Sequence, residues 1–158
     1  MKSSLHRVRR EIMIRATADQ VWDLLGDFNG AHRWQPWIPQ SEIDGGADGK
    51  QVGDMRVFRS SGRETRETLT AYDAQGKMLA YSVPDAVFAG RVAITDYLAI
   101  LSVESVGAKA RAVWEATFRA TEVDAAHAES VLGGDIYERG LRSLREVAER
   151  ESSKDARS

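Results

Sequence analysis

The stretch that decides the fold is AAHAESVLGGDIYERGLRSLREVAE, residues 125–149. Leu132, Ile136 and Leu144 recur in it at helical spacing, with charged residues on the other side, which predicts one long amphipathic helix. The polar residues Glu151–Ser158 are predicted to form a frayed tail. A sheet buries its apolar face only against another element, so we expect this helix to cover the sheet that precedes it.

The chain ahead of this helix is typical of strands joined by tight turns. His6–Ile14 alternates apolar and charged residues, which predicts a half-buried strand. Five further segments are rich in β-branched and aromatic residues, and their connections are too short for crossover helices. We therefore expect an antiparallel meander of the following segments: Asp54–Arg59, Arg63–Tyr72, Met78–Pro84, Ala93–Ser105 and Arg111–Thr121.

Two short helical segments are predicted after the first strand. Thr17 and Gln20 have the spacing of a capping box, which opens a helix. A second helical turn over Ala31–Trp34 is ended by Pro36. Early helices, a run of strands and a final long helix together indicate an α+β domain.

Length, composition and charge exclude several classes of protein. The 158 residues suit one domain of ordinary soluble composition, with 42% hydrophobic and 29% charged residues. Balanced charge, 22 basic against 24 acidic residues, argues against a nucleic-acid partner. The apolar stretches are too short to cross a bilayer, and the N-terminus lacks the apolar core of a signal peptide, so we expect a cytoplasmic protein with no membrane span.

Motifs for metal or cofactor binding are weak. The chain has no cysteine, and His6, His32 and His127 are scattered, so no metal site is expected. The glycine-rich segment Gly45–Gln51 lacks the spacing and the hydroxyl residue of a phosphate loop. We expect no cofactor.

Charged residues stand at strand positions that should face inward. Arg56 shares a strand face with Phe58 and Ser60, and Glu67 lies on the corresponding face of the next strand. Buried charges are costly unless they are paired, which predicts an Arg56–Glu67 ion pair between neighbouring strands. The same charges would also orient a polar group of a ligand in a cavity. Gly133, Gly134 and Gly140 inside the final helix also have two interpretations. They either allow close packing of the helix against the sheet or leave space for a ligand.

Fragments along almost the whole chain resemble one family. They include V-W-D-L-L-G-D-F-N-G-A-H-R-W from Val21, V-G-D-M-R-V from Val52, E-T-L-T-A-Y-D from Glu67 and Y-E-R-G-L-R-S-L from Tyr137. Their order and spacing are similar to those of polyketide cyclase/dehydrase-like members of the START-related (SRPBCC) superfamily. The resemblance implies a single helix-grip domain over residues 1–150, with a curved antiparallel sheet of about seven strands, in the order β-α-α-β6-α, around the C-terminal helix.

The resemblance also implies a deep apolar cavity between the sheet and the final helix. It places ligand-binding residues on the cavity wall at the following positions: Arg56, Phe58, Ser60, Thr65, Glu67, Tyr81, Tyr97, Trp114, Leu132, Ile136 and Gly140. Plant hormone receptors of the superfamily carry gate and latch motifs that differ from Ser61–Thr65 and Arg91–Ala93 here, so a hormone-receptor role is unsupported.

Three functions remain open from the sequence. The first is binding of a small hydrophobic ligand of lipid, polyketide or aromatic type. The second is a cyclase, aromatase or dehydratase that uses the same cavity, with Glu67 as base and Tyr81 or Tyr97 as donor. The third is an interaction module with a filled core, which would meet a partner through Trp34, Trp37 and the Pro36–Pro39 loop, although the sequence favours Trp34 as a core residue. Several members of the superfamily dimerise, so a homodimer is kept as an alternative state.

Overall fold

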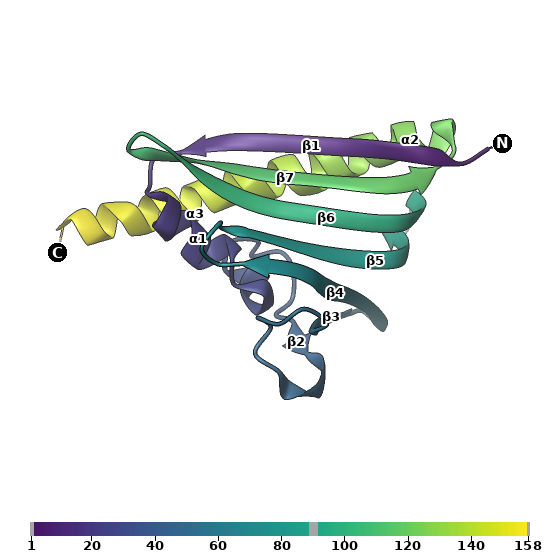
Figure 1. Ribbon diagram of the computed structural model, residues 1–158, viewed down its shortest axis with the longest axis horizontal. Coiled ribbons are helices and arrows are strands. Elements are labelled where there is room, and N and C mark those ends of the chain that lie inside the picture. The colour runs from purple at the N-terminus through teal and green to yellow at the C-terminus, as the bar shows by residue number, and fades with distance from the viewer. Residues whose placement is uncertain (1, 89–91, 158) are drawn as a thin grey trace.

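The fold is organised around one antiparallel sheet. The structure is a computed structural model that describes residues 2–88 and 92–157. Seven antiparallel strands form one sheet in the order β1-β7-β6-β5-β4-β3-β2, so the first strand lies beside the last (Figure 1). The strands are β1 (Ser4–Ile14), β2 (Glu42–Ile43), β3 (Met55–Ser60), β4 (Arg63–Asp73), β5 (Met78–Phe88), β6 (Val92–Val106) and β7 (Lys109–Ala120).

Helices cover one face of this sheet. At the N-terminal end, α1 (Ala18–Leu25) and the 3₁₀ helix η1 (Phe28–Arg33) follow β1, and a short 3₁₀ turn, η2 (Asp44–Gly46), follows β2. The capping box is confirmed, because Thr17 Oγ1 accepts from the Gln20 amide at 3.1 Å and Gln20 Oε1 accepts from the Thr17 amide at 2.9 Å. The α+β helix-grip architecture predicted from the sequence is confirmed.

The C-terminal helix has three parts and runs behind the sheet (Figure 1). They are α2 (Glu122–Ala128), the π-helix η3 (Glu129–Glu138) and α3 (Arg139–Arg157). The prediction that the helix ends at Glu149 and gives way to a frayed tail was wrong, because α3 continues through Arg157.

The π-helix changes which side chains face the sheet. An α-helix returns to one face every 3.6 residues, which would place residues 136 and 140 in line with Leu132. Hydrogen bonds five residues apart widen the turn, so Tyr137 carries the next fully buried side chain after Leu132. From there Leu141, Leu144 and Ala148 continue the buried stripe in α3. Leu132 and Leu144 are therefore buried as predicted, whereas Tyr137 takes the core position that the sequence assigned to Ile136.

Arg10 on β1 fits this widened turn. Its Nε donates to Glu138 Oε1 at 2.8 Å, and its Nη2 pairs with Glu129. Nine residues make two and a half turns of an α-helix, which would put these carboxylates on opposite faces. In the π-helix both carboxylates lie on the side of Arg10. Gly133 lies between the two glutamates in the chain, and a Cβ at this position would collide with the Arg10 guanidinium.

The position of the helix leaves one half of the sheet uncovered by it. The three parts of the helix pack against β1, β6 and β7, and α1 packs against α3 at one end. The opposite half of the sheet, β3 and β4, lies across from η3 with space between them. This space is the cavity described below.

Two helical glycines differ in what surrounds them, and this generates a stability prediction. A Cβ on Gly140 would lie 2.8 Å from Trp114 Cζ3, whereas a Cβ on Gly134 would meet open space. Gly140→Ala is expected to lower the free energy of unfolding by about 1–3 kcal/mol through overpacking. Gly134→Ala is expected to raise it by roughly 0.5–1 kcal/mol.

Urea unfolding of both variants, followed by circular dichroism, measures these changes. Effects of the same sign at the two positions would contradict the described packing of Trp114 against the helix.

Candidate ligand-binding cavity

A cavity of about 1020 Å³ lies between β3, β4, η3 and the segment after η1. Its volume is at the upper end of the roughly 300–1,000 Å³ that small-molecule sites occupy. Apolar surface predominates on its wall. The lining residues are Ala31, Gln35, Trp37, Ile38, Pro39, Arg56, Phe58, Ser60, Ser61, Arg63, Thr65, Glu67, Tyr81, Tyr97, Trp114, Val131, Asp135, Ile136 and Arg139.

Most of the residues predicted from the sequence lie on this wall. They are Arg56, Phe58, Ser60, Thr65, Glu67, Tyr81, Tyr97, Trp114 and Ile136. Leu132 and Gly140 do not line the cavity, so the expectation that they look into it was wrong. The widened turn of η3 directs Leu132 into the core and leaves Gly140 against the Trp114 ring. On the helix, Val131, Asp135 and Arg139 take these wall positions together with Ile136.

A buried ion pair lies at the inner end of the cavity. Arg56 and Glu67 are register partners on β3 and β4, only 6% and 8% exposed. Arg56 Nε and Nη2 both contact Glu67 Oε1, at 2.7 and 2.6 Å. Arg56 Nη1 donates to the Phe28 carbonyl oxygen at 2.7 Å. The pair predicted from strand parity is therefore present, and all three guanidinium nitrogens are engaged.

Aromatic rings surround the same guanidinium. Arg56 Cζ lies 4.1 Å from the ring centroid of Phe28, 4.8 Å from that of Tyr81 and 5.2 Å from that of Phe58. Ring faces attract a cation, by as much as about 2 kcal/mol where water is excluded. The rings therefore add to the carboxylate in offsetting the cost of burying this charge.

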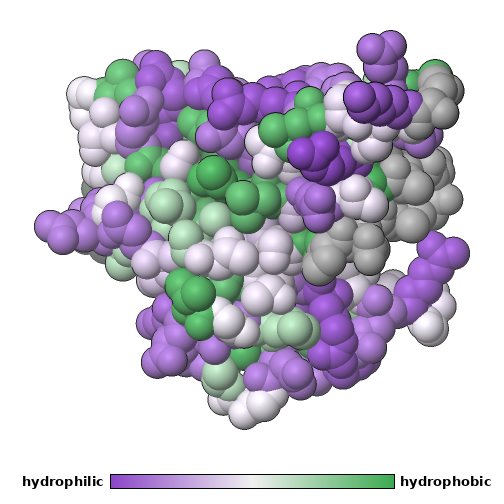
Figure 2. Space-filling model, turned by 45° about the vertical axis from the view of Figure 1, so that its right-hand side comes forward, coloured by the Kyte–Doolittle hydropathy of each residue, from purple (hydrophilic) through white to green (hydrophobic). Residues whose placement is uncertain are grey.

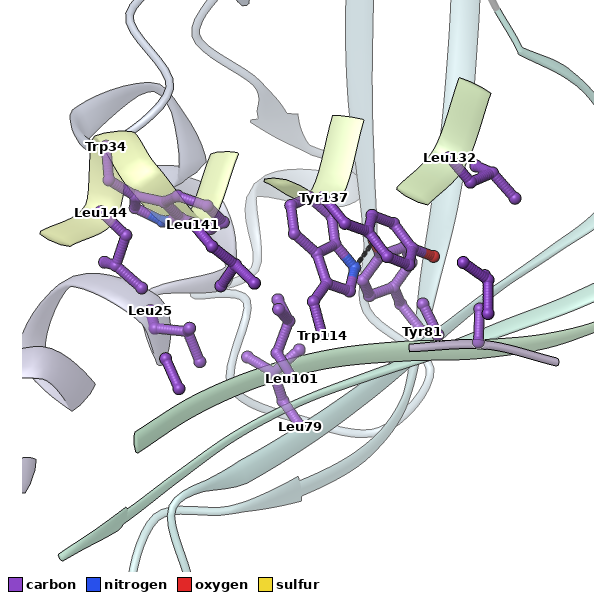
Figure 3. Packing of buried hydrophobic residues seen from close by; sticks show 14 of the residues in the cluster. Leu25, Trp34, Leu79, Tyr81, Leu101, Trp114, Leu132, Tyr137, Leu141 and Leu144 are labelled. Carbon is purple, nitrogen blue, oxygen red and sulfur yellow. Dashed lines mark hydrogen bonds between the residues drawn. The ribbon is translucent and has the colours of Figure 1, made fainter. Parts of the chain in front are cut away.

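Tyrosine hydroxyls form a second polar cluster beside the ion pair. The Tyr97 and Tyr137 hydroxyls are hydrogen-bonded to one another. Trp114 Nε1 donates to the Tyr81 hydroxyl at 3.2 Å (Figure 3). Burial raises the pKa of all three tyrosines well above its ordinary value, and for Tyr81 the charge of Glu67 adds to the rise. At neutral pH these hydroxyls are protonated, so the cluster presents uncharged donors and acceptors.

Trp114 links this cluster to the core. Its ring stacks on Tyr137 with centroids 4.3 Å apart and meets the edge of Trp34 at 5.6 Å. Figure 3 shows Trp114 and Tyr137 side by side, with Leu101 and Leu79 below them on the sheet. Sequence reasoning missed Tyr137, because α-helical spacing assigned the inward position to Ile136. It also missed Gln35, a buried amide on the wall from an irregular segment with no periodicity.

The outer end of the cavity is open and partly polar. Ser60 and Thr65 are exposed there, and Trp37 is 38% exposed, with the Arg139 guanidinium 3.9 Å above its ring. Trp34, by contrast, is 2% exposed. The sequence interpretation that favoured Trp34 as a core residue is therefore confirmed, and the cavity argues against an interaction module with a filled core. On the face shown in Figure 2, hydrophobic side chains lie in separate groups divided by hydrophilic ones.

The described residues hold neither a metal-binding cluster nor a membrane-spanning helix. Among residues 2–88 and 92–157, no group of three or more His, Cys, Asp or Glu side chains is gathered as a metal would require. No helix in this part of the chain has the length and apolar character needed to cross a membrane.

Comparison with protein families decides the classification. Residues 6–149 match the family described as polyketide cyclase/dehydrase and lipid transport. The chain belongs to this family. A comparison with curated proteins found no match.

Solved structures share the fold over nearly the whole chain. A protein from Thermobifida fusca is 33% identical with a TM-score of 0.82, covering 91% of this chain and 93% of that one. A protein from Bacillus thuringiensis is 26% identical with a TM-score of 0.76, covering 90% and 98%. Norcoclaurine synthase from Thalictrum flavum, solved with a transition-state analogue, has a TM-score of 0.72 over 96% and 98% of the two chains. At 13% identity, the last of these shows the fold alone.

The buried ion pair generates a stability prediction. Glu67→Met leaves the Arg56 charge buried without its carboxylate, so we expect it to lower the free energy of unfolding by about 3–5 kcal/mol. The double variant Arg56→Met/Glu67→Met removes both charges and is expected to be more stable than Glu67→Met alone. Denaturant unfolding of the single and double variants measures the coupling between the two residues.

Losses that simply add in the double variant would contradict the pairing of these two side chains. The matched control is the exposed pair Arg59–Glu42, whose disruption is expected to cost less than about 1 kcal/mol.

Proposed function

We propose that this protein binds a small, largely apolar molecule of polyketide or aromatic type, with a polar group of that molecule at the inner end of the cavity. The observation that carries the proposal is the Arg56–Glu67 ion pair beside protonated tyrosines, on the wall of a 1020 Å³ cavity. A polar group buried without hydrogen bonds is costly, so an apolar cavity with a polar inner end favours a molecule of matching polarity.

The wall offers two kinds of contact to such a molecule. The rings of Phe58, Tyr81 and Trp114 supply flat apolar surface, and burial of apolar surface stabilises by about 25 cal/mol per Å². The tyrosine hydroxyls and the Gln35 amide supply hydrogen-bonding groups without net charge. A ligand hydroxyl or carbonyl oxygen fits these groups. Membership of a family described by polyketide and lipid chemistry supports the same class of ligand.

Catalysis is the second candidate, and the linked tyrosine hydroxyls favour it. A hydroxyl whose pKa is raised keeps its proton and can donate a hydrogen bond to a carbonyl oxygen on which charge develops, as a cyclase or dehydratase step requires. Glu67 is less suited to act as the base, because its Oε1 already accepts a hydrogen bond from Arg56 Nε and forms an ion pair with Nη2. This engagement favours binding over acid–base catalysis.

A cavity-blocking variant tests the binding function. The neutral dye N-phenyl-naphthylamine fluoresces in apolar surroundings and serves as the probe. Thr65→Trp places an indole in the cavity, and we expect it to weaken dye binding at least about tenfold, which corresponds to 1.4 kcal/mol. Fluorescence titration gives the dissociation constants.

The matched control is Thr70→Trp, the same substitution at an exposed position of the same strand that does not line the cavity. It is expected to bind the dye as the unmodified protein does. Equal affinity in both variants, or no binding by the unmodified protein, would refute the proposed function.

A further inference from the structure

The arginines of the β3–β4 hairpin differ in whether acidic side chains neutralise them. Arg59 pairs with Glu42 and Glu64, and Arg66 pairs with Asp44 and Glu64. Both stand on the strand face that points away from the cavity. Arg63 stands on the cavity side and has no ion pair within the described part of the chain. The hairpin therefore directs an uncompensated positive charge toward the mouth.

A second arginine reaches the mouth from the helix side. Arg139, at the start of α3, lines the cavity with its guanidinium 3.9 Å above the Trp37 ring. The ring orients this charge without neutralising it, and the described residues contain no carboxylate paired with it. The acidic lining residue nearby in sequence, Asp135, already has an interaction partner. Arg63 and Arg139 thus place positive charge at the mouth from two different elements.

At the inner end of the cavity, by contrast, the positive charge is neutralised. Arg56 is matched by Glu67 and by the Phe28 carbonyl oxygen, so its guanidinium nitrogens already have acceptors. A ligand carboxylate placed there would lose its hydration beside the negative charge of Glu67, which is strongly unfavourable. Uncharged polar groups meet no such penalty from the tyrosine hydroxyls.

We propose that the cavity selects an anionic amphiphile, which inserts an apolar body with an uncharged polar group and leaves its carboxylate or similar anion at the mouth, between Arg63 and Arg139. This inference rests on the proposed function and adds to it the charge and the orientation of the ligand. It also assigns Arg63 and Arg139 as specificity-determining residues.

A pair of dyes separates the anionic group from the apolar body. Anilinonaphthalene sulfonate and N-phenyl-naphthylamine share the same ring skeleton and differ in the sulfonate. Arg63→Gln and Arg139→Gln are each expected to weaken sulfonate-dye binding about three- to tenfold, with a larger loss in the double variant. Binding of the neutral dye should change less than about twofold. Added salt should weaken the sulfonate dye selectively, since exposed charges are screened.

Two controls test whether charge at these positions is responsible. Arg59→Gln removes an arginine of the same hairpin that points away from the cavity, and it should leave both dyes unaffected. Arg139→Lys keeps the positive charge and should retain most of the affinity for the sulfonate dye.

The outcomes separate this inference from the proposed function. If Thr65→Trp blocks the neutral dye but the arginine variants leave the sulfonate dye unchanged, the cavity binds ligands and the charge selection is refuted. If Arg59→Gln weakens the sulfonate dye as much as Arg63→Gln does, the selection is again refuted. If Thr65→Trp fails to block the neutral dye, the proposed function itself is refuted.

Discussion

The Arg56 guanidinium is the constraint on which the architecture of the cavity depends. It joins three separate parts of the chain, since it contacts Glu67 on β4 from its own position on β3 and also bonds the Phe28 carbonyl oxygen of η1. Rings of Phe28, Phe58 and Tyr81 enclose it. A buried cation requires partners around it, so η1 and the strands β3 and β4 are held at a fixed separation. That separation sets where the cavity ends.

The π-helix determines the opposite wall. An α-helix of the same sequence would bring Ile136 and Gly140 in line with Leu132, whereas the widened turn buries Tyr137 and leaves Val131, Ile136 and Arg139 facing the cavity. Tyr137 then reaches the Tyr97 hydroxyl and stacks on Trp114. The Tyr97–Tyr137 hydrogen bond and the place of Arg139 on the cavity wall both follow from this local change of helical turn.

Local rules in the sequence were sufficient for much of the fold. Alternation located β1, β-branched and aromatic content located the other long strands, and the Thr17–Gln20 spacing located α1. These signals all depend on neighbours in the chain. Strand parity also predicted the Arg56–Glu67 pair. The two-residue strand β2 and the wall residues Gln35 and Trp37 carry no periodic signal. The change of helical turn was also missed, and Arg10, which binds both of its ends, lies more than a hundred residues away in the chain.

The central claim is that the uncharged polar inner end of the cavity receives a hydrogen-bonding group of an apolar ligand. Isotope-filtered nuclear Overhauser spectroscopy with bound naphthol tests it most directly. Contacts are expected from the naphthol ring to the aromatic protons of Tyr81, Tyr97 and Trp114. Contacts confined to exposed apolar residues such as Leu5 and Val123 would contradict it.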